Sequence, residues 1–135
     1  GELFIDGIDS WGLTMDSQGA VYVSDFKKHE VRRYDKGGDK SGTVVAGGHE
    51  KGEGLHQLDW PTGIFVDAQL TLYVADSSNN RVMKWPKGAK EGMIVAGGSF
   101  QGKALNQLYL PNGVWADGCG NIFVVDTGND RVVLW

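Results

Sequence analysis

The sequence predicts an all-β fold in which a unit of four short strands is repeated three times. A hairpin pattern recurs along the chain: an apolar run that ends in Asp, a short polar turn, and a second apolar run that ends in an aromatic residue. It lies at residues 19–34, 70–85 and 120–135, and residues 45–85 align with residues 95–135 at an offset of 50 without a gap. No segment shows the sustained 3.6-residue period that an amphipathic helix requires.

Short apolar runs separated by glycine-rich and polar turns define the strands. A lone run at Glu2–Ile5 is predicted to be an outer strand, d. Strands a, b, c and d of the first unit follow at Trp11–Met15, Val21–Ser24, Val31–Tyr34 and Thr43–Ala46. In the second unit they lie at Gly63–Val66, Leu72–Ala75, Arg81–Trp85 and Met93–Ala96, and the third unit repeats strands a, b and c 50 residues later. Glycine-rich links, Gly47–Pro61 and Gly97–Pro111, join each strand d to the next strand a.

The units form a single array over residues 1–135 in the order d-abc, d-abc, d-abc, with repeats at about 1–42, 43–92 and 93–135. Strands b and d are apolar almost throughout, and a strand that is apolar on both faces must be covered on both faces. A radial stack of small sheets provides this cover, because each sheet packs against two neighbours. We therefore predict antiparallel β-propeller blades, whose two end blades expose apolar faces and favour association.

The composition narrows the classes of partner. The net charge of −4 argues against a concentrated basic face, so nucleic acid is not expected as a partner. No apolar run is long enough to span a membrane, so membrane insertion is not expected. Cys119 is the only cysteine, which excludes an internal disulfide.

Three motifs of the later repeats resemble the NHL-repeat family. They are Pro-x-Gly-(apolar)-x-x-Asp at 61–67 and 111–117, Tyr/Phe-Val-x-Asp at 73–76 and 123–126, and Asn-x-Arg-Val before an aromatic residue at 79–85 and 129–135. The first repeat departs from the pattern, with Ser10 in place of Pro, Lys28 in place of Asn and Glu30 in place of Arg. The resemblance implies a six-bladed propeller, of which this chain would be half or a fragment. It also implies a scaffold that binds proteins, RNA or glycans, with a related minority of metal-dependent lyases and hydrolases.

The most regular polar residues are expected to be structural. Asp76 ends strand b and Arg81 opens strand c across a short turn, and Asp126 and Arg131 repeat this arrangement. We expect cross-strand ion pairs, with Asn79 and Asn129 in the left-handed position of each turn. In the first repeat Asp25 faces Glu30, so the pair is lost, and His29 is hypothesised to give this turn a different pH response.

No catalytic residue, cofactor or metal site is predicted. The three histidines lie on different loops without the spacing of a zinc site. Asp16, Asp67 and Asp117 recur after strand a; they fit turn capping better than a ring around an axial cation. No phosphate-binding loop and no Gly-x-Ser-x-Gly nucleophile motif occurs.

Recognition is expected on one face. Because strand direction alternates, the b–c turns and the d–a links share one end of the blades, and such loops carry recognition on rigid scaffolds. The candidate ligand-binding residues are Lys28, His29, His49, Glu50, Trp60, Asn79, Asn80, Phe100, Asn129 and Asp130. The leading hypothesis is a non-enzymatic scaffold that binds a protein or further copies of itself, with a glycan as an alternative ligand. A structural subunit of a filament and a fragment of a metal-dependent lyase or hydrolase are the alternatives.

Overall fold

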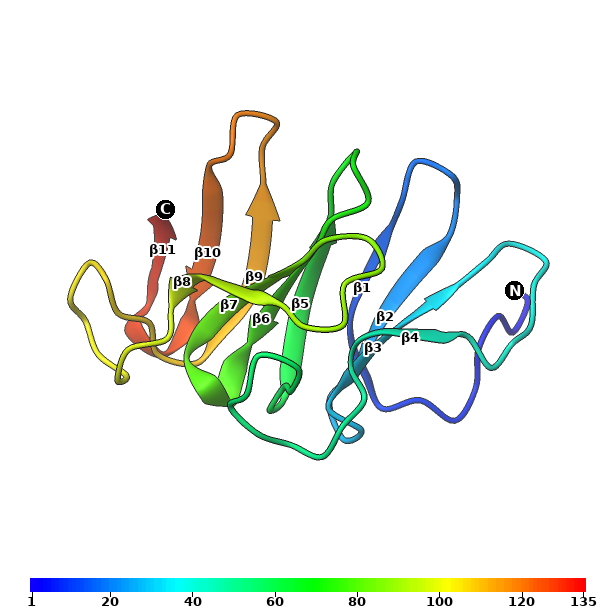
Figure 1. Cartoon of the computed structure of the whole chain (residues 1–135), viewed down its shortest axis with the longest axis horizontal. Coiled ribbons are helices and arrows are strands. Elements are labelled where there is room, and N and C mark those ends of the chain that lie inside the picture. Colours follow the sequence, from blue (N-terminus) through cyan, green and yellow to red (C-terminus); the bar gives the residue numbers. More distant parts are fainter.

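The computed structural model describes residues 1–135 and contains three antiparallel sheets, here called blades 1, 2 and 3, lined up in chain order (Figure 1). Blade 1 comprises β1 (Ser10–Met15), β2 (Val21–Asp25), β3 (Glu30–Tyr34) and β4 (Thr43–Gly47). Blade 2 comprises β5 (Pro61–Val66), β6 (Leu72–Asp76), β7 (Arg81–Trp85) and β8 (Met93–Gly97). Blade 3 comprises β9 (Pro111–Ala116), β10 (Ile122–Asp126) and β11 (Arg131–Leu134).

The predicted all-β, blade-type architecture is confirmed, and each blade pairs its strands in sequence order. The helical elements are two single 3₁₀ turns, η1 (Ser77–Asn79) and η2 (Thr127–Asn129). No helix in the structure has the length and apolar character needed to cross a membrane.

One predicted strand is absent. Glu2–Ile5 forms no strand, so the order is abcd, abcd, abc, with three strands in blade 3. Glu2–Ile5 lines a small cavity with residues 34, 35 and 37–40, and the backbone of Glu2–Ile5 has no strand partner. A strand exists only where a neighbour completes its hydrogen-bond ladder, and an apolar run cannot supply that by itself.

The hydrophobic core lies between the blades. One cluster joins Tyr22 and Val31 of blade 1 to Ile64 and Val74 of blade 2. A second joins blade 2 to blade 3, and β6, which is covered by both neighbours, is buried at every position. Strand β6 is apolar on both faces because blade 2, the central blade, packs against a neighbour on each side, as expected from the sequence.

Two glycines allow the inner strands to approach closely. A Cβ on Gly12 would lie 2.3 Å from the Thr62 oxygen of the next blade, and a Cβ on Gly63 would lie 2.4 Å from the Asn112 oxygen. Side-chain hydroxyls bridge the same seams, since Ser24 Oγ donates to Thr62 O at 2.7 Å and Thr62 Oγ1 donates to Pro111 O at 3.2 Å. The blades therefore repeat one docking geometry.

Candidate binding face

The turns between strands b and c meet the links that lead into the next blade, and this common surface is here called the loop face. The Gly48 N–H donates to His29 O at 3.3 Å, and the Gly98 N–H donates to Asn80 O at 3.1 Å. Side chains extend the contact: the Trp60 N–H donates to His29 Nδ1 at 3.1 Å and the Leu110 N–H donates to Asn80 Oδ1 at 2.9 Å. His29 in the turn of blade 1 and Asn80 in the turn of blade 2 thus each hold their blade to the next one.

One sequence prediction about these turns is wrong. The left-handed positions are His29, Asn80 and Asp130, with φ values of 54°, 51° and 53°, and not Asn79 and Asn129. The reason is that Asn79 and Asn129 close the 3₁₀ turns, and the left-handed residue follows each turn as its cap. Asn and Asp tolerate this conformation better than most residues.

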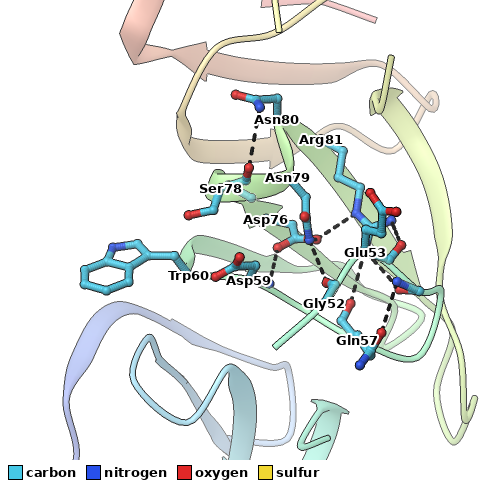
Figure 2. A network of polar contacts seen from close by, with 12 residues as sticks. Gly52, Glu53, Gln57, Asp59, Trp60, Asp76, Ser78, Asn79, Asn80 and Arg81 are labelled. Carbon is cyan, nitrogen blue, oxygen red and sulfur yellow. Dashed lines mark hydrogen bonds and ion pairs between the residues drawn. The ribbon is translucent and has the colours of Figure 1, made fainter. Parts of the chain in front are cut away.

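Asn79 instead takes part in a buried network of hydrogen bonds around Asp76 (Figure 2). The Asp76 carboxylate accepts the Asp59 N–H at 2.7 Å, Asn79 Nδ2 at 2.9 Å and Arg81 Nε at 2.7 Å. Burial raises the pKa of Asp76, although the hydrogen bonds from Asn79 and Asp59 and the charge of Arg81 oppose it. The carboxylate is therefore satisfied on both oxygens in a site closed to water.

Arg81 carries the network into the preceding link. Its guanidinium donates to Glu53 O at 2.7 Å, Gly54 O at 3.0 Å and Gln57 O at 3.2 Å. Asn79 Nδ2 adds a bond to Gly52 O at 2.8 Å. Three link carbonyls thus converge on one planar cation, which holds the glycine-rich link against blade 2.

Blade 3 repeats the network. Arg131 Nε donates to Asp126 Oδ2 at 2.7 Å, and Asn129 Nδ2 donates to the same oxygen at 2.8 Å. The Arg131 side chain is 25% exposed, whereas the Arg81 side chain is 4% exposed. The Asp76–Arg81 and Asp126–Arg131 ion pairs each hold a turn against a link. We therefore count these four residues as the structural frame of the fold and not as ligand-binding residues.

Blade 1 has lost the network. Glu30 stands at the place of the arginine and pairs with Arg32 Nε, while Lys28 Nζ lies 3.8 Å from Asp25 Oδ2. That Asp25 oxygen is fully buried and accepts no hydrogen bond. His29 Nδ1 lies 3.5 Å from Asp59 Oδ1, and its pH response stays a prediction that NMR titration of the ring and of the Trp60 amide would test.

An aromatic cluster lies where blade 1 meets blade 2. The Trp60 ring packs against Phe26 at a centroid distance of 4.6 Å with the planes tilted by 35°, and Phe26 meets Trp11 edge-on at 6.4 Å. Figure 2 shows the Trp60 ring pointing away from the Arg81 network. Trp11, Trp60 and Leu110 line an open cavity of about 340 Å³ beside this cluster.

Sequence reasoning selected Trp60 but missed Phe26 and Trp11 as its partners. The available signal was Phe26 itself, since the same turn position holds Ser77 and Thr127 in the later repeats. Trp11 gave no such signal, because an aromatic residue in an inner strand is ordinary for a core.

The other predicted residues are spread along the loop face. Phe100 is exposed and lines a hollow of about 620 Å³ with Asn79, Asn80 and Arg81. His49 is exposed, and its ring meets His56 edge-on at 5.0 Å. Glu50 is exposed on the first link. The structure thus brings Trp60 together with His29, and Phe100 together with Asn80, but gathers no single site from all ten.

The repeated aspartates cap turns. One oxygen of Asp67 accepts the N–H groups of Gln69 at 2.9 Å and Thr71 at 2.8 Å. Asp16 and Asp117 make the equivalent bonds. No group of three or more potential metal-binding side chains converges in the chain.

The Asp16 carboxylate has further partners. Burial alone would raise its pKa, but hydrogen bonds from backbone N–H groups and from Tyr22, together with the charge of Arg33, lower it overall. Arg33 Nε lies 3.4 Å from Asp16 Oδ2. Asp16 is therefore held in its ionised form within the fold of blade 1.

Comparison with known protein families gives one match, between residues 58–85 and the NHL repeat. Residues 58–85 are an NHL repeat. They include strands β5, β6 and β7 of blade 2, with the Asp76–Arg81 pair across the turn between β6 and β7. The resemblance stated from the motifs is thereby confirmed for the second repeat. No curated protein matches the chain.

Solved structures share the fold. A streptogramin B lyase is 15% identical with a TM-score of 0.62, and the alignment covers 99% of this chain and 43% of that one. An auxiliary nutrient binding protein from Bacteroides thetaiotaomicron VPI-5482 is 16% identical with a TM-score of 0.66, covering 89% of this chain and 35% of that one. The virginiamycin B lyase of Staphylococcus aureus is 11% identical with a TM-score of 0.54, covering 98% and 43%.

These structures are propeller-type proteins, and at such identities the likeness is one of fold alone. The chain spans less than half of their length. Its own side chains on the loop face must therefore carry any argument about what it binds.

Proposed function

We propose that the NHL-repeat chain is a non-enzymatic binding scaffold that holds a partner protein on its loop face and other copies of itself on its blade faces. The observation that carries the first part is the aromatic cluster of Trp60, Phe26 and Trp11. Trp60 and Trp11 are both substantially exposed, although each is large and apolar. Clustered tryptophan and phenylalanine side chains beside a cavity are typical anchors of protein interfaces.

The cluster is held rigidly, which favours binding. The Trp60 backbone is fixed by His29 Nδ1, and the Phe26 N–H donates to Asp9 O at 3.0 Å. A side chain already fixed in its bound position loses little conformational entropy when a partner docks. An apolar or aromatic side chain of a partner protein fits this cavity better than a charged group, because Trp11, Trp60 and Leu110 supply much of its wall. A glycan stacked on Trp60 is the alternative ligand.

A non-catalytic role is supported by the structural hydrogen bonds that the repeated aspartates and arginines make. The aspartates of the turns cap backbone N–H groups, and the arginines hold link carbonyls. Two of the fold neighbours are described as auxiliary nutrient binding proteins, so this architecture serves binding elsewhere. The two lyases compared above are 15% and 11% identical to this chain, and at such identities they share its fold alone.

The loop-face proposal is tested with a peptide-display library selected against the full chain. We expect selected peptides to share an apolar or aromatic anchor and to lose at least tenfold in affinity against Trp60→Ala, the usual scale for an interface anchor. Leu105→Ala is the matched control, since Leu105 is an exposed apolar residue on the other link. Peptides that bind the Trp60 and Leu105 variants equally well would refute the proposal.

A further inference from the structure

We infer that His49 and His56, on the link that joins blade 1 to blade 2, form a binding site for Zn²⁺. The two rings meet edge-on at a centroid distance of 5.0 Å, and both residues are exposed. The site is separate from the aromatic cluster that is proposed to bind a partner protein, because it uses none of the side chains of that cluster.

The separation of the two rings is the one that a shared metal ion requires. Zinc lies about 2.0 Å from each histidine nitrogen, so each ring centre lies about 3 Å from the metal. Two such rings at a tetrahedral angle have centres about 5 Å apart, which matches the observed 5.0 Å. The ring torsion of histidine is broad, so both exposed rings can turn a nitrogen toward a common point without moving the backbone.

The second link shows that the fold does not need these histidines. The first link closes with Gly52 N–H donating to Leu58 O at 3.2 Å, and the second link repeats this bond at 3.2 Å between Gly102 and Leu108. The metal-binding side chains of residues 49–56 are all absent from the second link: His49, Glu50, Glu53 and His56 become Ser99, Phe100, Lys103 and Asn106. The same backbone therefore forms with or without the two rings, and a structural role does not explain them.

The backbone of the first link is held so that its two histidines stay together. Gln57 Nε2 donates to Glu50 O at 3.0 Å, which joins the two ends of the segment. Arg81 holds its middle through the carbonyl groups of residues 53, 54 and 57 (Figure 2). A metal ion that binds here orders little further backbone, which favours affinity.

Exposed carboxylates are available to complete the coordination. No third metal-binding side chain converges on the pair, so water or the exposed Glu50 and Glu53 fill the other positions of a tetrahedral ion. The cations around the pair are Lys51, on the same link, and Lys90, which lines the same hollow as His49. Two carboxylates balance these two charges, so the surroundings carry no net positive charge against a divalent ion.

The ligand type selects the class of metal. Neutral imidazole suits zinc and the neighbouring transition metals, whereas Mg²⁺ takes oxygen ligands. Protonated imidazole has no lone pair for a metal, so binding should weaken as the pH falls below about 6.5. A bound ion would cross-link residues 49 and 56 and stiffen the link that leads to Trp60.

The experiment titrates the full chain with zinc chloride, followed by calorimetry and by NMR of the histidine rings. We expect one ion per chain and shifted ring signals of His49 and His56, with the His29 ring unchanged. His49→Ser and His56→Asn introduce the residues of the second link. Each should weaken binding at least tenfold, because even loss of a residue that only supports a metal ligand costs about 10- to 100-fold. Leu55→Ala is the control, a change at an exposed apolar residue beside His56.

The outcomes separate this inference from the proposed function. Absence of saturable zinc binding by the wild-type chain would overturn it, as would equal affinities of the wild type, His49→Ser and His56→Asn. An equal response to magnesium chloride, or binding that is unchanged at pH 5, would assign the ion to carboxylates and overturn it too. Circular dichroism shows that each variant is folded. None of these results bears on partner binding at Trp60, which the peptide selection tests.

Discussion

Arg81→Ala is the most informative change to the frame of this protein. The guanidinium is almost entirely buried and makes one ion pair with Asp76 and three bonds to link carbonyls. Its removal leaves the Asp76 carboxylate buried with only the Asn79 and Asp59 donors. Breaking a buried ion pair from one side costs about 3–5 kcal/mol, so we expect a loss of about 4 kcal/mol in the free energy of unfolding.

Arg131→Ala is the matched comparison. Arg131 makes the same set of bonds in blade 3, but its side chain is 25% exposed. Water can reach the space it leaves and solvate the Asp126 carboxylate, so we expect a loss of about 2 kcal/mol. The difference between the two variants isolates the contribution of burial, since the chemistry and the contacts are the same.

Urea unfolding followed by tryptophan fluorescence and circular dichroism gives both free energies. Amide hydrogen exchange should show faster exchange in residues 52–57 of Arg81→Ala, because the link loses its anchor. The double variant Asp76→Asn, Arg81→Met leaves no buried charge and should be more stable than Arg81→Ala. Equal losses in Arg81→Ala and Arg131→Ala, or a loss below about 1 kcal/mol in Arg81→Ala, would refute the reasoning.

Two further predictions concern the seam between blades and the pH dependence of blade 1. Gly63→Ala should lower the free energy of unfolding in urea by about 2 kcal/mol or more, since its Cβ would lie 2.4 Å from Asn112 O. Gly118→Ala is the control and should be near neutral, because the space around its Cβ is open. Equal effects of the two substitutions would contradict the close-approach explanation. Asp16→Asn should destabilise the chain at neutral pH, because the folded-state pKa of Asp16 is lowered and its stabilisation is present above the unfolded pKa of about 3.9. That difference should vanish as the pH falls through the lowered pKa, and a difference independent of pH would exclude the ion pair with Arg33 as its source.

Most of the strand pattern could be read from the sequence. The predicted strands at Val21–Ser24 and Leu72–Ala75 differ from β2 and β6 by one terminal residue. This was accessible because strand apolarity and turn glycines are local properties, and the 50-residue repeat checks each assignment against another copy. Glu2–Ile5 failed as a strand because pairing depends on a neighbour that local pattern does not reveal.

The candidate site was predictable only in part. The Asp76–Arg81 pair follows from a five-residue separation across one turn, so sequence spacing placed both side chains together. The contact between Trp60 and His29 joins residues 31 apart, and the choice of Asn80 as the left-handed residue depends on the 3₁₀ turn that precedes it. Neither is encoded in the spacing of residue types.

The sequence by itself determined the 50-residue repeat, most of the strands and the residues of the structural ion pairs, because each copy of the hairpin has the same local pattern of apolar, turn and charged residues. Only the tertiary structure decided which residues meet between blades: Trp60 with Phe26, and Leu110 with Asn80. These contacts join separate copies of the repeat, and their geometry is set by how one sheet packs on the next, a property of the stack that no single repeat contains.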